Sequence, residues 1–158
     1  MAKYFMTLPF KIAMLMFVLT IVAYFLVRRE QKKHFKSYNM TAIDKMSGIE
    51  FETMLKHVFR KMGYKVEETP KSNDYGADLI LTRHGKKTVI QAKRYSNKVG
   101  ISAVQQALSA QIFYDANESA VVTNSYFTNQ AKKMALTGKV KLIDRDVLEV
   151  ILSRLTND

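Results

Sequence analysis

The stretch ADLILTRHGKKTVIQAKRY, residues 77–95, decides the fold of this chain. It holds two runs rich in β-branched and aliphatic residues, 77–83 and 88–95, which are typical of strands. Between these runs, the segment 84–87 (HGKK) carries the glycine of a turn. The stretch therefore predicts an antiparallel hairpin.

The hairpin gathers three polar side chains on one surface. Pairing the run ends on either side of the turn sets a register in which Asp78 lies opposite Lys93. Gln91 shares the face of Lys93, because side chains alternate along a strand. A carboxylate, an amide and an ammonium group that converge in this way can hold a divalent metal and activate a water molecule beside a phosphodiester.

Before the hairpin, the sequence predicts a helix and a strand. The segment 47–50 (SGIE) fits a capping box, apolar residues recur at helical spacing after it, and Gly63 ends the helix. Residues 64–68 alternate as a strand, and 69–76 form a loop that leads to Asp78.

After the hairpin, two helices and two strands alternate before a last helix. Ser102 is expected to cap the first of these helices, and Thr128 the second, which stops at Gly138. Residues 120–123 and 140–143 are short apolar strands. The expected buried side of the first helix includes Val104, Leu108 and Ile112. The residues that line the last helix are Val147, Leu148, Ile151, Leu152 and Leu155.

The predicted order is αβββαβαβα, an α/β fold in which a mixed β-sheet is flanked by helices on both faces. Residues 47–158 are enough for one such core.

An apolar segment precedes this domain. Residues 8–27 contain one charge, Lys11, and predict a single transmembrane helix, because about 20 helical residues span a bilayer core. A cleaved signal peptide and a buried core helix are the alternatives. The cluster of lysine and arginine that follows, in 28–36, places the C-terminal domain in the cytoplasm, with the chain as a single-pass protein of the inner or plasma membrane.

Residues 28–46 are polar and basic, and they predict a juxtamembrane linker. Its positive charge can lie against anionic lipid headgroups, or serve only as a topology signal. The whole chain of 158 residues carries a net charge of +11, with both halves basic, which favours a polyanionic partner such as nucleic acid or an acidic membrane surface. The absence of cysteine excludes disulfides and thiolate metal sites.

From Ser47 onward the chain resembles the Mrr-type restriction endonuclease domain, a branch of the PD-(D/E)xK nuclease superfamily in its QxK variant. The matching pieces, in order, are IEFETMLKHVFRKMGY, NDYGADLIL, VIQAKRYSNKVG, AVQQA, AVVTNSYFT and KLIDRDVL. The D…QxK pattern alone recurs by chance, whereas the ordered set is specific. The resemblance implies a restriction-endonuclease-like fold and a DNA endonuclease that uses Mg²⁺ or another divalent cation such as Mn²⁺.

The resemblance also implies a site. Asp78, Gln91, the backbone carbonyl of Ala92 and Glu52 would hold the metal, while Lys93 would orient or deprotonate the attacking water. Gln91 stands where most of the superfamily has a carboxylate, so this site has one negative charge fewer.

Each of these residues also has an ordinary structural reading. Asp78 can cap the end of a loop, Gln91 can be a hydrogen-bonded strand residue, and Lys93 can be a surface lysine. Glu52 can pair with Lys56 on an exposed helix face.

Two second-tier site residues are Asp74, which can instead shape its loop, and Gln105, which can instead complete a capping box with Ser102. Basic side chains near the hairpin are expected to contact DNA phosphates: Lys86, Lys87, Arg94 and Lys98, with Arg83 also available. Arg94 is expected on the opposite face of its strand from Lys93, where a structural role is the alternative.

Two functions remain open at this point. The first is a membrane-anchored, Mg²⁺-dependent DNA endonuclease that restricts foreign or modified DNA, with no small-molecule cofactor and as a homodimer if both strands are cut. The second is a membrane-tethered DNA-binding module that keeps the fold with an attenuated site. The presence of Asp78, Lys93 and Glu52 favours the enzyme, and Gln91 favours the binding module.

Overall fold

The structure is a computed structural model that describes residues 8–36, 38–70 and 75–157. It divides into two compact units, Met1–Ser37 and Tyr38–Asp158, which are described separately. The first unit contains α1 (Leu8–Lys36), a single helix of 29 residues. Its window Phe10–Val27 has a mean hydropathy of 2.4, so by length and composition it could cross a membrane.

The second unit has the predicted order of elements, preceded by one short helix. Its strands are β1 (Lys65–Glu68), β2 (Leu79–Arg83), β3 (Lys86–Lys93), β4 (Glu118–Thr123) and β5 (Lys141–Ile143). Its helices are α2 (Met40–Ile43), α3 (Gly48–Lys61), α4 (Ile101–Phe113), α5 (Asn129–Gly138) and α6 (Arg145–Asn157).

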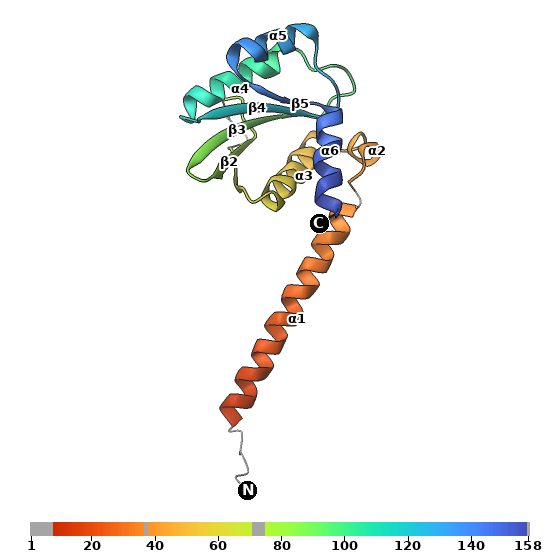
Figure 1. The fold of residues 1–158 in the computed structure, drawn as a ribbon, viewed down its shortest axis with the longest axis vertical. Helices are drawn as coiled ribbons and strands as arrows, with labels where there is room; N and C mark the ends of the chain where they lie inside the picture. Colours follow the sequence, from red (N-terminus) through yellow and green to blue (C-terminus); the bar gives the residue numbers. More distant parts are fainter. Residues whose placement is uncertain (1–7, 37, 71–74, 158) are drawn as a thin grey trace. The chain divides into compact units, whose positions relative to one another are not determined.

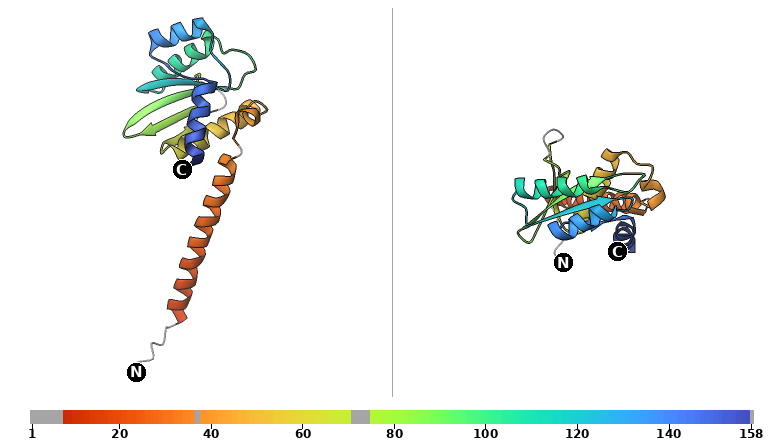
Figure 2. Two further views of the ribbon diagram at one scale, coloured as in Figure 1. Left: turned by 45° about the vertical axis from the view of Figure 1, so that its right-hand side comes forward. Right: turned by 90° about the horizontal axis from the view of Figure 1, so that it is seen from above.

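The five strands form one mixed sheet in the order β1-β2-β3-β4-β5. The first three strands are antiparallel, whereas β3, β4 and β5 are parallel, so the chain must cross over the sheet between them. Helices α4 and α5 cover one face, and α3 and α6 cover the other (Figures 1 and 2). The predicted mixed sheet with helices on both faces is confirmed.

The register of the β2–β3 hairpin differs from the prediction by two residues. Arg83 pairs with Lys86, so the turn consists of His84 and Gly85 alone, with φ angles of 50° and 75°. These left-handed conformations are those of a tight two-residue hairpin turn. Asp78 therefore does not lie opposite Lys93, as the four-residue turn predicted.

Asp78 lies instead beside residues of β3 that come before Lys93 in the sequence. Its backbone N–H donates to the carbonyl of Ile90 at 2.8 Å, one step beyond the pairing of Leu79 with Ile90. Because the slip is an even number of residues, it leaves each side chain on its predicted face of the sheet. The polar side chains of Asp78 and Gln91 thus still converge.

Helix caps at two positions agree with the sequence. Ser47 and Glu50 form the expected capping box, with Glu50 N–H donating to Ser47 Oγ at 3.2 Å and Ser47 N–H donating to Glu50 Oε2 at 2.7 Å. Thr128 Oγ1 accepts from Ala131 N–H at 3.2 Å, as predicted for the start of α5.

Helix α4 begins earlier than predicted, and of its three predicted core positions Val104 is buried and Leu108 is partly buried. Its N-cap is Gly100, so Ser102 lies inside the helix and does not cap it. Ile112, predicted to be buried, is 83% exposed. The buried positions are the small residues Ala103, Val104, Ala107 and Ala110, which allow α4 to lie close against the sheet.

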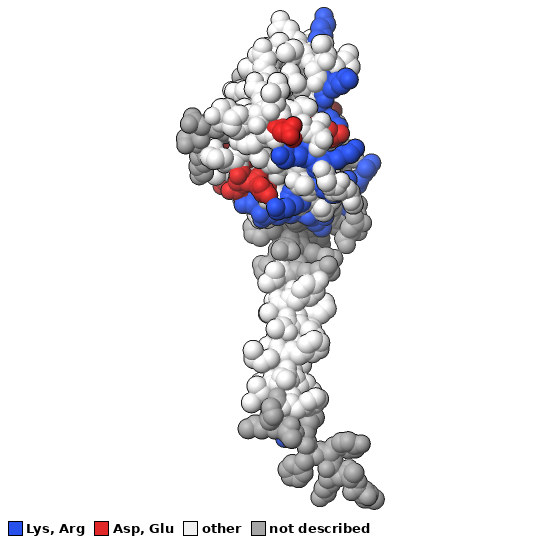
Figure 3. Space-filling view, turned by 90° about the vertical axis from the view of Figure 1, so that its left-hand side faces the viewer, with Lys and Arg blue, Asp and Glu red and all other residues white. Residues whose placement is uncertain are grey.

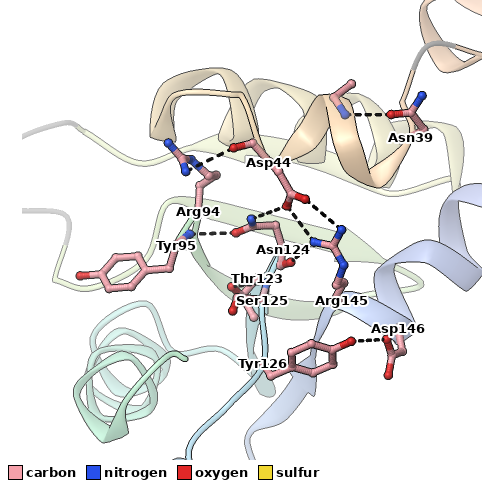
Figure 4. Close-up of polar contacts among 11 residues, drawn as sticks. Asn39, Asp44, Arg94, Tyr95, Thr123, Asn124, Ser125, Tyr126, Arg145 and Asp146 are labelled. Carbon is pink, nitrogen blue, oxygen red and sulfur yellow. Dashed lines mark hydrogen bonds and ion pairs between the residues drawn. The ribbon is translucent and has the colours of Figure 1, made fainter. Parts of the chain in front are cut away.

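Residues 38–46, which the sequence suggested as linker, belong to the second unit and pack against its later elements. Met40 and Ile43 of α2 are buried, and Asp44, just after α2, is held by Arg145 at the start of α6 (Figure 4). Arg145 donates from Nη1 to Asp44 Oδ1 at 2.7 Å and from Nη2 to Asp44 Oδ2 at 2.9 Å. This two-bond geometry is the strongest form of an arginine–carboxylate contact.

Asn124 connects the Asp44–Arg145 pair to the sheet. It is 3% exposed, and its Nδ2 donates to Asp44 Oδ1 at 2.8 Å while its Oδ1 accepts from Tyr95 N–H at 2.8 Å (Figure 4). Tyr95 follows β3 by two residues, and Asn124 directly follows β4. This cluster, Asp44, Asn124 and Arg145, is called the clamp below, and it fixes the end of β3 that carries Lys93.

Substitution in the hairpin turn tests the register. We expect Gly85→Ala to destabilise the protein by about 1 kcal/mol, because a Cβ disfavours the left-handed conformation. His84→Asn is the matched variant, and it should leave the stability unchanged or raise it, since asparagine tolerates this conformation. Thermal unfolding by circular dichroism measures both, and equal melting temperatures for Gly85→Ala and the parent would contradict the two-residue turn.

Acid unfolding tests the clamp. The hydrogen bonds from Arg145 hold the pKa of Asp44 below the ordinary aspartate value, against the opposing effect of partial burial. A lowered folded pKa stabilises the protein above the unfolded value of about 4, and this stabilisation is lost as the pH falls through the folded pKa. We expect Asp44→Asn to cost roughly 1 kcal/mol at pH 7 and progressively less below about pH 4.

Asp115→Asn serves as the control for Asp44→Asn, because Asp115 is exposed and lies outside the clamp, at a φ of 47° that asparagine also adopts. Chemical unfolding of both variants from pH 7 to pH 3 makes the comparison. A stability loss for Asp44→Asn that is the same at every pH would rule out the ion pair as its cause.

Candidate active site

A cleft of about 420 Å³ lies between the sheet and α4. Asp78, Gln91 and Lys93 line this cleft, together with Gly76. The remaining lining residues are Tyr75 and, from α4, Ser102, Gln105, Gln106 and Ser109. The three polar residues that the sequence grouped thus share one cleft, even though the strand register was wrong.

Asp78 and Gln91 contact each other directly in the cleft. Asp78 Oδ2 accepts from Gln91 Nε2 and from the backbone N–H of Ala92, the latter at 2.6 Å. The same Nε2 also lies 3.3 Å from the carbonyl oxygen of Ala92. The carboxylate oxygen of Asp78 and the carbonyl oxygen of Ala92 therefore both face the same point, which Gln91 Nε2 occupies.

This arrangement fits a hard divalent cation. Mg²⁺ prefers oxygen ligands and retains several waters, so a few protein oxygens suffice. A half-turn of the Gln91 amide, which is 4% exposed, would direct Oε1 instead of Nε2 at the same point and add a third oxygen. Asp78, Ala92 and Gln91 thus supply oxygen atoms of the kind that such a cation prefers.

The donor set is poor in negative charge. Among the described residues, no group of three or more histidine, cysteine, aspartate or glutamate side chains could hold a metal ion. Glu52, which the resemblance adds to the site, does not line the cleft. It lines a second hollow of about 330 Å³, together with Glu68 and Asp78, so Asp78 borders both cavities.

The helix partner expected for Glu52 contacts another residue. Lys56, its expected partner four residues later in α3, contacts Glu68 of β1 instead. Glu52 is half-buried and has a contact of its own, and it shares the second hollow with Asp78. A role near the metal therefore remains a prediction for Glu52.

Lys93 is half-buried at the end of β3 and faces the cleft. Its Nζ makes no ion pair or hydrogen bond with any residue in the part of the chain that the structure describes. An ammonium group without a protein partner is available to a phosphate oxygen or to a water molecule in the cleft.

The cations expected to contact phosphates mostly have structural partners. Lys87 Nζ donates to the carbonyl of Tyr114 at 2.8 Å, and Arg83 Nη1 donates to the carbonyl of Met62 at 3.1 Å. Arg83 also lies over the ring of Tyr64, 4.3 Å from its centroid.

The remaining basic residues of that group lie away from the cleft lining. Arg94 Nη1 lies 3.5 Å from the carbonyl of Asp44, on the clamp side of β3 (Figure 4). Lys86 and Lys98 are exposed, in the hairpin and in the loop after β3. Phosphate contacts by these two exposed lysines remain a prediction.

The second-tier residues have different outcomes. Asp74 lies outside the described residues, and Gln105 lines the cleft from α4. The sequence reasoning missed Ser102, Gln106 and Ser109, which with Gln105 form one polar face of α4. Their spacing of three or four residues is the signal that could have identified this face.

A protein family model and one sequence relative match this chain. A restriction endonuclease family model, Mrr_cat, matches residues 43–152. An uncharacterized protein of Sinorhizobium fredii, y4cE, is 27% identical over 119 residues. That match covers 66% of this chain and 30% of the relative, so the chain spans less than a third of the length of that protein.

Two solved structures share the fold. The crystal structure of a protein of unknown function, AF1548, matches 65% of this chain and 64% of its own, with a TM-score of 0.57 and 18% identity. The DNA modification-dependent restriction endonuclease AspBHI matches 81% of this chain and 36% of its own, with a TM-score of 0.58 and 17% identity.

Proposed function

Because this chain belongs to the Mrr-type restriction endonuclease family, whose model covers residues 43–152, we propose that it is a membrane-anchored, divalent-metal-dependent DNA endonuclease. The observation that carries this proposal is the shared cleft of Asp78, Gln91 and Lys93. It combines a carboxylate, a neutral oxygen donor and a free ammonium group, which are the groups that phosphodiester hydrolysis requires.

We infer that Asp78, Ala92 and Gln91 hold Mg²⁺ or Mn²⁺, and that Glu52 supports the site from the adjoining hollow. Support comes from the two oxygens that converge at Gln91 Nε2. When bound, the cation would neutralise charge on the phosphate and lower the pKa of a water molecule. The chain contributes the position of each oxygen, and the 2.6 Å bond from Ala92 N–H fixes the carboxylate of Asp78.

Lys93 is proposed to contact the reacting phosphate. Its ammonium group has no described protein partner, so it can donate to a non-bridging oxygen and stabilise the charge that develops there. It can also orient the attacking water through a hydrogen bond. The clamp supports this role, because it holds the residues that directly follow Lys93.

The N-terminal helix is proposed to anchor the enzyme in the inner or plasma membrane with the catalytic domain in the cytoplasm. Support comes from the hydropathy of Phe10–Val27 and from the basic residues that follow it in the sequence. Foreign or modified DNA is the proposed substrate, and a homodimer is proposed if both strands are cut. A DNA-binding module with an attenuated site is the second candidate, favoured by the single carboxylate of the donor set.

Nicking of supercoiled plasmid tests the proposal. The full-length chain, purified in a mild detergent, should nick the plasmid in the presence of Mg²⁺ and stop when the metal is chelated. Lys93→Ala and Asp78→Asn should each lower the initial rate by about 100-fold or more, the range typical of such groups.

Two matched variants show whether the loss of any surface charge, or a difference between protein preparations, changes the nicking rate. Lys132→Ala removes an exposed lysine of α5, and Asp115→Asn neutralises an exposed carboxylate outside the cleft; both should retain the parental rate. Plasmid that is bound but left intact by the parent would favour the attenuated module. Nicking that persists in Lys93→Ala would point to a contaminating nuclease.

Gln91→Glu tests the donor set. The added carboxylate should tighten Mn²⁺ binding by roughly tenfold, because affinity for hard cations rises with ligand charge. Without metal, the variant should melt at a lower temperature than the parent, since two carboxylates would then adjoin and Asp78 would lose its amide donor.

Isothermal titration calorimetry and thermal melts with and without Mn²⁺ measure the two effects of Gln91→Glu. Gln130→Glu, at an exposed position of α5, is the control and should change neither quantity. Unaltered Mn²⁺ affinity in Gln91→Glu would place the cation elsewhere.

A further inference from the structure

Helix α4 carries no charged residue, although the chain as a whole has a net charge of +11. The four α4 residues that line the cleft are two serines and two glutamines, and among the described lining residues Lys93 alone is a lysine or arginine. Figure 3 shows one face of the domain, on which the upper left is largely uncharged and lysine and arginine lie at the upper right edge and, in greater number, lower down. This wall of the cleft therefore offers neutral hydrogen-bonding groups instead of cations.

The polar groups of this wall are not used by the fold. Within the described part of the chain, the side chains of Gln105, Gln106, Ser102 and Ser109 form no recorded hydrogen bond. Gln111, the remaining glutamine of α4, accepts from Ser119 Oγ at 2.6 Å and has a structural role. Unused amides and hydroxyls at a cleft wall match the donors and acceptors on the edges of nucleobases.

An aromatic pair adjoins the same wall. The rings of Tyr75 and Phe113 stack with centroids 3.5 Å apart and an interplanar angle of 14°. Tyr75 also lines the cleft, and the two side chains remain 51% and 52% exposed. The pair thus presents an open aromatic surface beside the proposed catalytic residues.

The backbone holds this pair close to α4. A Cβ added at Gly76 would lie 2.7 Å from the carbonyl oxygen of Gln106 and 2.8 Å from its Cβ, so only glycine permits the approach. The neighbouring Tyr75 is consequently fixed beside the C-terminal half of the helix, where its ring meets Phe113.

We propose that the uncharged face of α4 and the Tyr75–Phe113 pair form a nucleobase-binding surface, so that the enzyme acts on DNA whose bases are unpaired next to the scissile phosphate. This inference rests on the proposed function and specifies its substrate. Stacking on an exposed ring requires a base whose face is free, which a continuous duplex does not offer. A duplex would also bring many phosphates to a wall that carries no cation on α4.

Binding measured without cleavage tests the proposal. The full-length chain in detergent is titrated, in the presence of EDTA, into a fluorescein-labelled single strand and into a perfect duplex of the same sequence. The parent should bind the single strand more tightly. Phe113→Leu and Tyr75→Leu should each weaken single-strand binding by roughly tenfold and leave duplex binding unchanged, since stacking on one ring contributes on this scale.

Ile112→Ala is the matched control, because Ile112 is 83% exposed next to Phe113 but has no ring to stack. Equal or tighter binding of the duplex by the parent would overturn the proposal, as would an equal loss for both DNA forms in Phe113→Leu. The proposal would also be overturned if Phe113→Leu left DNA binding unchanged and instead dissociated an oligomer, as measured by light scattering.

The plasmid assay separates this inference from the proposed function. A chain that nicks plasmid without favouring single strands retains the nuclease function and loses the nucleobase surface. A chain that favours single strands through Phe113 but does not nick retains the surface and loses the nuclease function.

Discussion

The period of two along a β-strand is the constraint on which the site depends. Asp78 precedes β2 and Gln91 and Lys93 lie on β3, and they reach one cleft because each has its side chain on the α4 face. The tight turn at His84 and Gly85 fixes the alignment of the two strands. A slip by one residue would move one strand's groups to the face covered by α3, whereas a slip by two leaves every group on its face.

The fact that the register error was an even number of residues explains how much of the site could be predicted from the sequence. The wrong turn length misplaced Asp78 along the strand but not across the sheet, so the predicted group of three residues survived. The order of elements was predictable because caps and alternation are local signals, as at Ser47 and Thr128. The start of α4 was not, because Gly100 caps it by backbone conformation alone and Ser102 offered a stronger chemical signal.

Long-range polar contacts were beyond the reach of sequence reasoning. Asp44 lies 101 residues from Arg145, and no periodic pattern links the two positions. Asp44 and its neighbours read as a linker because they are polar, yet the buried Met40 and Ile43 and the clamp tie them to the domain. The consequence for the site is a fixed end of β3, with Arg94 directed to the clamp and Lys93 left for the cleft.

The parallel pairing of β3 with β4 also determines where the parts of the cleft lie in the chain. Because β3 and β4 are parallel neighbours, the chain must cross over the sheet between them, and such a crossover is right-handed. Helix α4 forms this crossover and therefore covers β3. Of the nine described residues that line the cleft, six therefore fall within positions 91–109. Gene recombination that exchanged this one segment between homologues would move Gln91, Lys93 and the polar side of α4 together, whereas Asp78, Tyr75 and Phe113 would stay with the recipient gene.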